Sequence, residues 1–247
     1  MLAGTADPKG FERDAPTMPS FAENGVEFPN AVFVQALFEI EAASMCEMLP
    51  PALHPTLPPV AGITVLDVPE SEWGPFRMAE LRIQCRSGLR SRAMGVSTVV
   101  DRAEVGVELA ERFGFRVVLG EVALERAYHE TRIEVGAEGA TWASAAMRGP
   151  KRIGEGDMQF VSTMHPAQTP VGFRLVQLDT RYGVQRAERA PLDLEVFDAA
   201  AWGESRIVPS LMLPAVVGIA DVRLDAIRFA CRAEVMAFEG SEKVGAR

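Results

Sequence analysis

The chain has 247 residues, of which 48% are hydrophobic and 24% are charged, and its formal net charge is −9. This composition is ordinary for a soluble globular protein, and the length allows either one large β-rich domain or two small ones. The acidic charge argues against nucleic acid as a partner, because binding phosphates requires a basic surface.

Segments that would direct the chain to a membrane are not found in the sequence. No run of 18 or more apolar residues occurs, and the first residues, MLAGTADPKGFERDAP, contain no hydrophobic signal core. The three cysteines are widely spaced and form no CxxC pair, which is typical of reduced thiols in a reducing compartment. We therefore expect a cytoplasmic protein without a membrane partner.

The distribution of glycine, proline and charge predicts three regions. Residues 1–30 are rich in Gly, Pro, Asp and Glu, and predict an extended N-terminal arm that is either disordered or wrapped over a neighbouring subunit. A single domain is expected over residues 31–238. Residues 239–247 resemble a frayed tail.

Strand patterns dominate the expected domain. β-Branched and apolar residues, punctuated by Gly and Pro, predict an antiparallel meander and then a long series of strands and turns. The predicted strands are 32–34, 62–68, 76–86, 94–100, 116–125, several within 131–217, and a last strand before residue 238.

Helical spacing occurs in two places. Residues 42–49 suit a short helix, which Pro50 and Pro51 would end. After Asp101, a plausible N-cap, apolar residues recur every four positions up to Phe113, and Gly114 is a natural C-cap. The sequence therefore predicts a strand-dominated α+β fold with a few short helices.

The stretch WGPFRMAELRIQCR, residues 73–86, is the most informative of these segments. Successive side chains of a strand point to opposite faces of a sheet. One face therefore carries a row of polar residues, namely Glu80, Arg82, Gln84 and Arg86. Such a row is either a solvated sheet face, which is the more common arrangement, or the wall of a polar cavity.

Known catalytic and binding motifs are almost absent. The sequence has no GxGxxG, Walker loop, GxSxG, HExxH or EF-hand loop. The three histidines are far apart and none has acids at ligand spacing, so no metal site is expected. His129, in the polar cluster ERAYHE, is either a general base or, more commonly for such a position, a surface histidine.

Four segments together resemble the acetoacetate decarboxylase family. They are LPPALHP, WGPFRMAELRI, GVELAERFGF and APLDLEVFDA, and their order and spacing follow the family over roughly residues 30–235. The resemblance implies a β-rich antiparallel cone or closed barrel around a small polar cavity, with no cofactor, and a homo-oligomeric assembly. If the resemblance holds, the row of polar residues on the 76–86 strand lines this cavity, and the ligand is a small carboxylic acid.

The resemblance also implies roles for particular residues. Glu80 matches a cavity glutamate that follows the Gly-Pro-aromatic turn, and Glu108 matches the glutamate of a Gly-x-Glu segment. Both have structural alternatives, because Glu80 could pair with a neighbouring arginine and Glu108 with Arg112, its i+4 neighbour on a helix.

One departure from the family affects the chemistry directly. The family carries a Pro-Lys-Lys element whose second lysine forms a Schiff base with a keto acid, whereas residues 113–118 here read FGFRVV. Arg116 lies in this region, but an arginine stays protonated and forms no imine. The family also places an arginine near its N-terminal strand, and this chain has no Arg between Arg13 and Arg77.

Three hypotheses about function follow. The first is an enzyme that performs lyase or isomerase-type acid/base chemistry on a small oxo- or hydroxy-acid, with Glu80 as the acid/base and with Arg82, Arg86, Arg116 and Gln84 binding the substrate. The second is a Schiff-base decarboxylase that uses Lys151, although a solvated turn lysine is the simpler interpretation of that residue. The third is a small-molecule-binding protein without catalysis, in which Glu80 only pairs with an arginine inside an apolar cavity.

Overall fold

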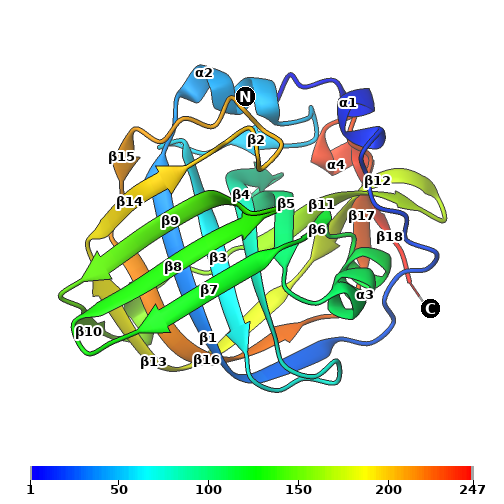
Figure 1. Ribbon diagram of the computed structural model, residues 1–247. Helices are drawn as coiled ribbons and strands as arrows, with labels where there is room; N and C mark the ends of the chain where they lie inside the picture. The colour runs from blue at the N-terminus through cyan, green and yellow to red at the C-terminus, as the bar shows by residue number, and fades with distance from the viewer. Residues whose placement is uncertain (1, 246–247) are drawn as a thin grey trace.

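Strands account for most of the secondary structure in the computed structural model, which describes residues 2–245 (Figure 1). Eighteen strands form in the described chain: β1 Val26–Glu39, β2 His54–Pro55, β3 Val60–Val68, β4 Phe76–Ser87, β5 Arg90–Val100, β6 Val117–Leu119, β7 Glu121–Arg126, β8 Glu130–Ala137, β9 Ala140–Arg148, β10 Lys151–Ile153, β11 Ser162–Thr169, β12 Gly172–Leu178, β13 Thr180–Ala190, β14 Leu192–Phe197, β15 Leu211–Met212, β16 Ala215–Leu224, β17 Phe229–Cys231 and β18 Ser241–Lys243.

Helices are few and short. They are α1 Pro8–Glu12, α2 Ala42–Met48, α3 Ala103–Phe113 and α4 Ala237–Gly240, with one 3₁₀ turn, η1, at Glu155–Asp157. The two helices that the sequence predicted are present as α2 and α3. Gly114 ends α3 with φ of 76°, a left-handed conformation that glycine adopts without steric cost. The expected strand-dominated fold with few helices is confirmed.

A large sheet of 14 strands forms the body of the molecule. Its order is β10-β13-β16-β1-β3-β4-β5-β11-β12-β17-β18, with β15, β2 and β6 paired to β1, β4 and β5. Most pairs are antiparallel, as expected, but β5 pairs in parallel with both β6 and β11. The end strands β10 and β18 do not pair with each other in the described part of the chain, so the closed barrel is not confirmed.

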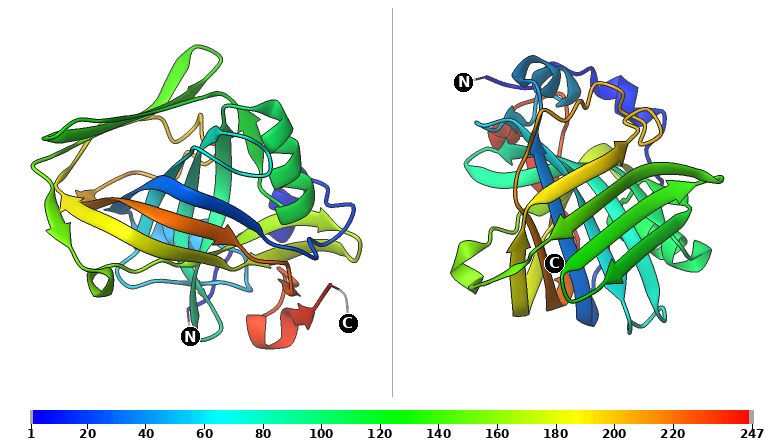
Figure 2. Two further views of the ribbon diagram at one scale, coloured as in Figure 1. Left: turned by 90° about the horizontal axis from the view of Figure 1, so that it is seen from below. Right: turned by 60° about the vertical axis from the view of Figure 1, so that its left-hand side comes forward.

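A second sheet of four strands, in the order β14-β9-β8-β7, lies across one face of the large sheet (Figures 1 and 2). Residues 116–125 were predicted as one strand, but they divide between the sheets as β6 and β7. The division falls at Gly120, where a Cβ atom would lie 2.3 Å from the Gly136 carbonyl oxygen. A residue without a side chain is therefore needed where the chain passes from one sheet to the other.

Two apolar cores result from this arrangement. One contains Leu81 and Ile83 of β4 together with Val135 of β8 and Met147 of β9, so it lies between the two sheets. The other contains Met78 of β4 together with residues of α3, β1 and β16. Because neighbouring residues of β4 alternate between faces, this strand contributes to both cores and is inaccessible over most of its length.

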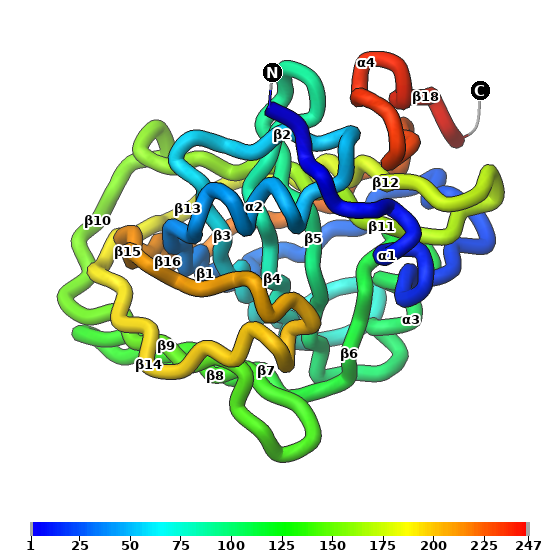
Figure 3. Tube along the Cα trace, turned by 90° about the horizontal axis from the view of Figure 1, so that it is seen from above, coloured from blue at the N-terminus to red at the C-terminus, as the bar shows by residue number. Residues whose placement is uncertain are grey.

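The N-terminal arm follows the surface of its own chain instead of extending from it (Figure 3). The Gly4 amide donates to the Leu53 carbonyl oxygen at 2.8 Å, and the Met18 amide donates to the Gln168 carbonyl oxygen at 2.7 Å. The expected end of the arm at residue 30 is wrong, because β1 begins at Val26 and pairs with β16.

The expected frayed tail is also wrong for most of its length. Residues 237–240 form α4, and β18 pairs antiparallel with β17, so backbone hydrogen bonds hold this segment. Residues 246–247 lie outside the described part of the chain. No helix among the described residues is both long and apolar enough to cross a bilayer.

Candidate active site

The polar row on β4 divides into a buried half and an accessible half. Glu80 is 1% exposed and the Arg82 side chain 11%, whereas Gln84 is half-buried and Arg86 is exposed at the end of the strand. The solvated-face interpretation therefore fits Arg86 but is wrong for Glu80. Burying an ionised carboxylate is costly unless it is paired, so a buried Glu80 carboxylate requires partners.

Glu80 has two charged or chargeable partners, one on each carboxylate oxygen. The Arg82 Nε–H donates to Glu80 Oε2 at 2.5 Å. The His165 Nε2 atom lies 2.9 Å from Glu80 Oε1. His165 is 2% exposed and comes from β11, which pairs in parallel with β5 beside β4. These three side chains are called the buried triad below.

The triad depends on a glycine in the neighbouring strand. Gly95 is the Cα partner of Arg82 across the β4–β5 pair, next to a β-bulge. A Cβ atom built on Gly95 would lie 2.6 Å from Glu80 Oε1 and 2.6 Å from His165 Cδ2. Any larger residue at position 95 would therefore clash with Glu80 and His165 and disturb the hydrogen bond between them.

Hydrogen-bond geometry fixes the number of protons in the triad. His165 Nδ1 lies 3.1 Å from the Phe113 carbonyl oxygen, and since a carbonyl oxygen only accepts, Nδ1 carries a proton. The contact between His165 Nε2 and Glu80 Oε1 then needs a second proton, held by either atom. The Glu80–His165 pair is neutral overall in both cases, so Arg82 leaves the buried triad with a net charge of +1.

The pKa of Glu80 shows which effect dominates. Burial alone would raise the pKa of this carboxyl, but the Arg82 charge and the hydrogen bond and charge of His165 outweigh it and hold the pKa below its ordinary value of 4.5. Burial likewise opposes the charge on Arg82, yet Glu80 and Tyr182 raise its pKa. Of these two arrangements, the lowered pKa favours the one in which Glu80 is ionised and able to accept a proton.

Two aromatic side chains lie next to the triad. The Phe115 and His165 rings have centroids 4.1 Å apart. Phe115 is 2% exposed, so an apolar ring is buried against the His165 side chain. Tyr182 of β13 lies near Arg82, and burial raises the pKa of its hydroxyl although the Arg82 charge opposes this.

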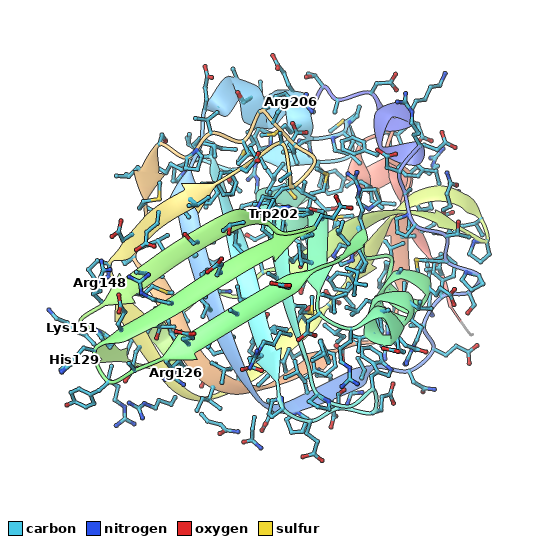
Figure 4. All side chains as sticks on the ribbon, viewed as in Figure 1. Arg126, His129, Arg148, Lys151, Trp202 and Arg206 are labelled. Atoms are coloured by element: carbon cyan, nitrogen blue, oxygen red, sulfur yellow. The ribbon has the colours of Figure 1, made fainter. Side chains whose placement is uncertain are left out.

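The other predicted site residues do not join the triad. Glu108 is on α3 and pairs with Arg112 at 3.3 Å, which matches the helix alternative given for it. His129 is exposed in the β7–β8 turn, where its ring packs against Tyr128 with centroids 4.5 Å apart. Lys151 is exposed on the edge strand β10, and Figure 4 shows both residues at one side of the molecule.

Arg116 lies at a separate cavity of about 350 Å³ beside the triad. This cavity reaches Gly95 and Pro166, but none of its lining residues belongs to the triad; the lining is Ala6, Asp7, Gly10, Phe11, Asp14, Ala15, Glu47, Ile83, Met94, Gly95, Val96, Arg116, Pro166, Gly203, Glu204 and Arg206. The charged lining residues are four acids and two arginines.

Both arginines of this cavity are already paired. Arg116 Nη2 is 3.5 Å from Asp14 Oδ2, and Arg206 donates two hydrogen bonds to Glu204 at 2.7 and 2.6 Å. With an excess of acids and with its arginines occupied, the cavity is not preformed for a carboxylate. Among the described residues, no group of three or more His, Cys, Asp or Glu side chains is arranged to hold a metal ion.

Sequence reasoning missed His165 and Tyr182. His165 lies in STMHPAQT, where Pro166 argues against a strand and no acid stands nearby in sequence. The sequence pattern that could have identified His165 was the alternation of side chains along a strand, because Thr163, His165 and Ala167 share one buried face of β11. No local pattern distinguished Tyr182, and its role depends on a distant strand.

Comparison with known proteins adds to this geometry. No family model and no curated protein sequence match the chain. Among solved structures, acetoacetate decarboxylase from Legionella pneumophila matches with a TM-score of 0.70 and 18% identity, covering 87% of this chain and 88% of that chain. Another acetoacetate decarboxylase structure matches with a TM-score of 0.71 and 12% identity, covering 94% and 91% of the two chains.

The chain has an acetoacetate decarboxylase-like fold. The resemblance of the four sequence segments is thus confirmed for the fold. The enduracididine biosynthesis enzyme MppR, complexed with pyruvate, has the same fold, with a TM-score of 0.68, 14% identity and coverage of 93% and 91%. An acetoacetate decarboxylase-like enzyme from Sphingomonas wittichii matches with a TM-score of 0.62 and 15% identity, covering 83% and 92% of the two chains.

Proposed function

We propose that this chain is an acetoacetate decarboxylase-like enzyme that moves protons on a small 2-oxo acid without forming a Schiff base. The buried triad is the observation that carries the proposal. Ionisable groups with perturbed pKa values, enclosed together in a protein interior, are characteristic of functional sites. A neighbour of the same fold is complexed with pyruvate, which makes pyruvate the first acid to test.

Arg82 supplies the binding group in this proposal. A guanidinium has five N–H donors in a planar fork, and the hydrogen bond to Glu80 uses one of them. The remaining donors suit a carboxylate, and the net positive charge of the triad favours an anion over a neutral molecule. Arg86 is exposed at the end of β4, and Arg116 lines the separate cavity, so the proposal gives this role to neither of them.

Glu80 supplies the base. Each carboxylate oxygen accepts more than one hydrogen bond, so Glu80 retains acceptor capacity beside Arg82 and His165. In the proposed step, a C–H bond next to the oxo group breaks and its proton passes to Glu80. The electron pair moves to the oxo oxygen, where the positive triad stabilises the enolate. Return of a proton to carbon regenerates the acid, so the step needs no oxidant, reductant or cofactor.

Imine chemistry has little support from the lysine positions. The chain contains three lysines, Lys9, Lys151 and Lys243, and each is exposed. A Schiff-base lysine must be deprotonated to attack, which enzymes achieve by burial or by a neighbouring cation. The sequence alternative that used Lys151 therefore lacks the enclosed amine that it requires.

Exchange of the methyl protons of pyruvate for deuterium tests the proposal directly. In D₂O, proton NMR should show loss of the methyl signal faster with the wild-type chain than with buffer, and the Glu80→Gln variant should reduce this rate by at least about 100-fold. The Glu108→Gln variant is the matched control and should exchange normally, because Glu108 lies on α3 outside the triad. Absence of exchange with pyruvate in the wild type would contradict the proposal.

A binding protein without catalysis is the second candidate. The buried ion pair between Glu80 and Arg82 is the feature that supports it. Borohydride reduction in the presence of pyruvate, followed by intact mass, separates the remaining routes. Binding without exchange and without a reduced adduct supports the binding protein, whereas an adduct on Lys151 restores Schiff-base chemistry.

A further inference from the structure

We propose that residues 7–15 form an autoinhibitory strap over the cavity beside the buried triad, in which the Asp14 carboxylate occupies Arg116. A small carboxylic acid binds Arg116 after it displaces Asp14 and the strap opens. Residues 7–15 are called the strap below. The inference rests on the proposed function, because it takes pyruvate as the acid and concerns a cavity that borders the same site.

The cavity and the triad meet at Gly95. This residue lines the cavity of about 350 Å³, and a Cβ atom built on it would lie 2.6 Å from Glu80 Oε1. Pro166, which also lines the cavity, directly follows His165 on β11. A volume of this size is within the range of small-molecule sites in proteins. The cavity is thus placed to receive a small acid next to the proposed catalytic groups.

The strap forms one side of this cavity, and backbone hydrogen bonds hold the chain on either side of it (Figure 3). Before the strap, the amides of residues 4–6 donate to carbonyl oxygens within residues 46–53 at 2.8 to 3.0 Å. After it, Thr17 forms a parallel bridge with Gln168. Among the described residues, no backbone–backbone hydrogen bond joins the strap itself to another segment. Opening of the strap therefore breaks few backbone hydrogen bonds.

Side chains hold the middle of the strap through weak contacts. Arg116 Nη2 lies 3.5 Å from Asp14 Oδ2, and the two side chains are 40% and 56% exposed. The Gln168 side-chain amide donates to the Glu12 carbonyl oxygen at 3.4 Å. Phe11 is half-buried against the apolar core between the two sheets. An exposed ion pair shifts an equilibrium by at most about fivefold, so a ligand that competes with Asp14 has little to overcome there.

Arg116 is held by parts of the fold that do not belong to the strap. Its carbonyl oxygen accepts a hydrogen bond from the Thr98 amide at 2.8 Å, next to the pairing of β5 with β6. Its guanidinium lies against Gly203, where a built Cβ atom would be 3.3 Å from Nη1. A guanidinium suits a carboxylate, and Asp14 presents that group from within the chain. When the strap opens, Arg116 therefore remains in place as a binding group for the carboxylate of a ligand.

Opening of the strap also changes the charge of the cavity. With the strap closed, four acids and two arginines line the cavity, which gives a net charge of −2. Two of these acids, Asp7 and Asp14, belong to the strap. Without them two acids and two arginines remain, so the net charge is zero, and Arg206 stays paired with Glu204. The closed cavity therefore repels an anion, and the open cavity offers it an unpaired Arg116.

The positions of the three lysines make opening of the strap measurable by proteolysis. Lys9 lies in the strap, whereas Lys151 lies on β10 and Lys243 on β18. A lysine-specific protease, with fragments identified by intact mass, reports opening of the strap as cleavage after Lys9 and opening elsewhere as cleavage after Lys151. Saturating pyruvate should accelerate cleavage after Lys9 by at least about twofold and leave cleavage after Lys151 unchanged. Sodium chloride at the same ionic strength is the control, because salt alone screens exposed ion pairs.

Two variants test whether the ion pair holds the strap closed. Asp14→Asn and Arg116→Met each break the pair, so both should cleave faster after Lys9 in the absence of pyruvate. Pyruvate should cause no further acceleration in Arg116→Met, because the group that binds the acid is missing. Glu23→Gln is the matched control, since Glu23 is an exposed acid that follows the strap and does not line the cavity, and it should respond as the wild type does.

The same two variants should change pyruvate exchange in opposite directions. At low pyruvate, Asp14→Asn should exchange at least about threefold faster than the wild type, because the internal competitor is gone. Arg116→Met should exchange about tenfold more slowly under the same conditions, because a hydrogen-bonded charge that captures the acid is lost. An ion pair with only a structural role would not give effects of opposite sign, so changes in the same direction overturn the inference.

The outcomes separate this inference from the proposed function. Exchange in the wild type, without an effect of pyruvate on cleavage after Lys9 beyond that of sodium chloride, overturns the inference and leaves the proposed function standing. Accelerated cleavage that depends on Arg116, without any exchange, supports the inference and overturns the catalytic proposal. If pyruvate causes neither exchange nor cleavage, both are overturned.

Discussion

Replacing Glu80 by glutamine isolates the energetic role of the buried triad. The substitution keeps the side-chain volume but removes the negative charge from a residue that is 1% exposed. Arg82, whose side chain is 11% exposed, then remains charged without a counter-ion. Breaking a buried ion pair by removing one partner typically costs about 3–5 kcal/mol. In a chain of this size that corresponds to a fall of about 10 °C in Tm.

Thermal unfolding at pH 7, followed by circular dichroism, measures the effect. The double variant Glu80→Gln with Arg82→Met should recover part of the lost stability, because the unpaired charge is gone. Glu72→Gln is the control, since Glu72 is half-exposed in its ion pair with Arg112 and should shift Tm by less than about 2 °C. A fall below about 3 °C in Glu80→Gln, or a double variant less stable than the single one, would refute the assignment of a desolvated charge cluster.

Three further outcomes follow from the same geometry. Gly95→Ala should lower both Tm and the rate of pyruvate exchange, because its Cβ would meet Glu80. Gly156→Ala is the control and should leave both unchanged, because no atom lies within 4 Å of its Cβ. Equal Tm values in the two variants would contradict the close contact at Gly95. Because the folded-state pKa of Glu80 is below its ordinary value, the ionised carboxylate contributes its full stabilisation above about pH 4.5. This stabilisation is lost as the pH falls through the folded-state pKa, so the free energy of unfolding should depend less steeply on pH in the acid range in Glu80→Gln than in the wild type. Burial raises the pKa of Cys85 to about 12, so peptide mapping after iodoacetamide treatment at pH 8 should find this thiol unmodified and the half-buried Cys46 modified; alkylated Cys85 in the folded protein would disprove its enclosure.

Local patterns in the sequence identified one half of the candidate site. Alternation along residues 76–86 placed Glu80 and Arg82 on one face, because the side-chain period of a strand does not depend on the rest of the fold. The same reasoning found α3, since its apolar spacing and Gly114 are properties of a single segment. Counting lysines further showed that the family's Schiff-base element is absent, which is a statement about composition and needs no structure.

The tertiary structure decided what these residues meet. His165 lies 85 positions from Glu80, and their hydrogen bond exists because β11 pairs in parallel with β5 in a register that places Thr163 opposite Ala93. The choice between a solvated face and an enclosed one was likewise not encoded in residues 76–86, because burial of a strand face depends on the elements that cover it. A strand's period is fixed by its own backbone, whereas its environment is fixed by pairings over long sequence separations. For that reason the sequence indicated an acid and an arginine side by side, and only the folded chain made them part of a triad with His165.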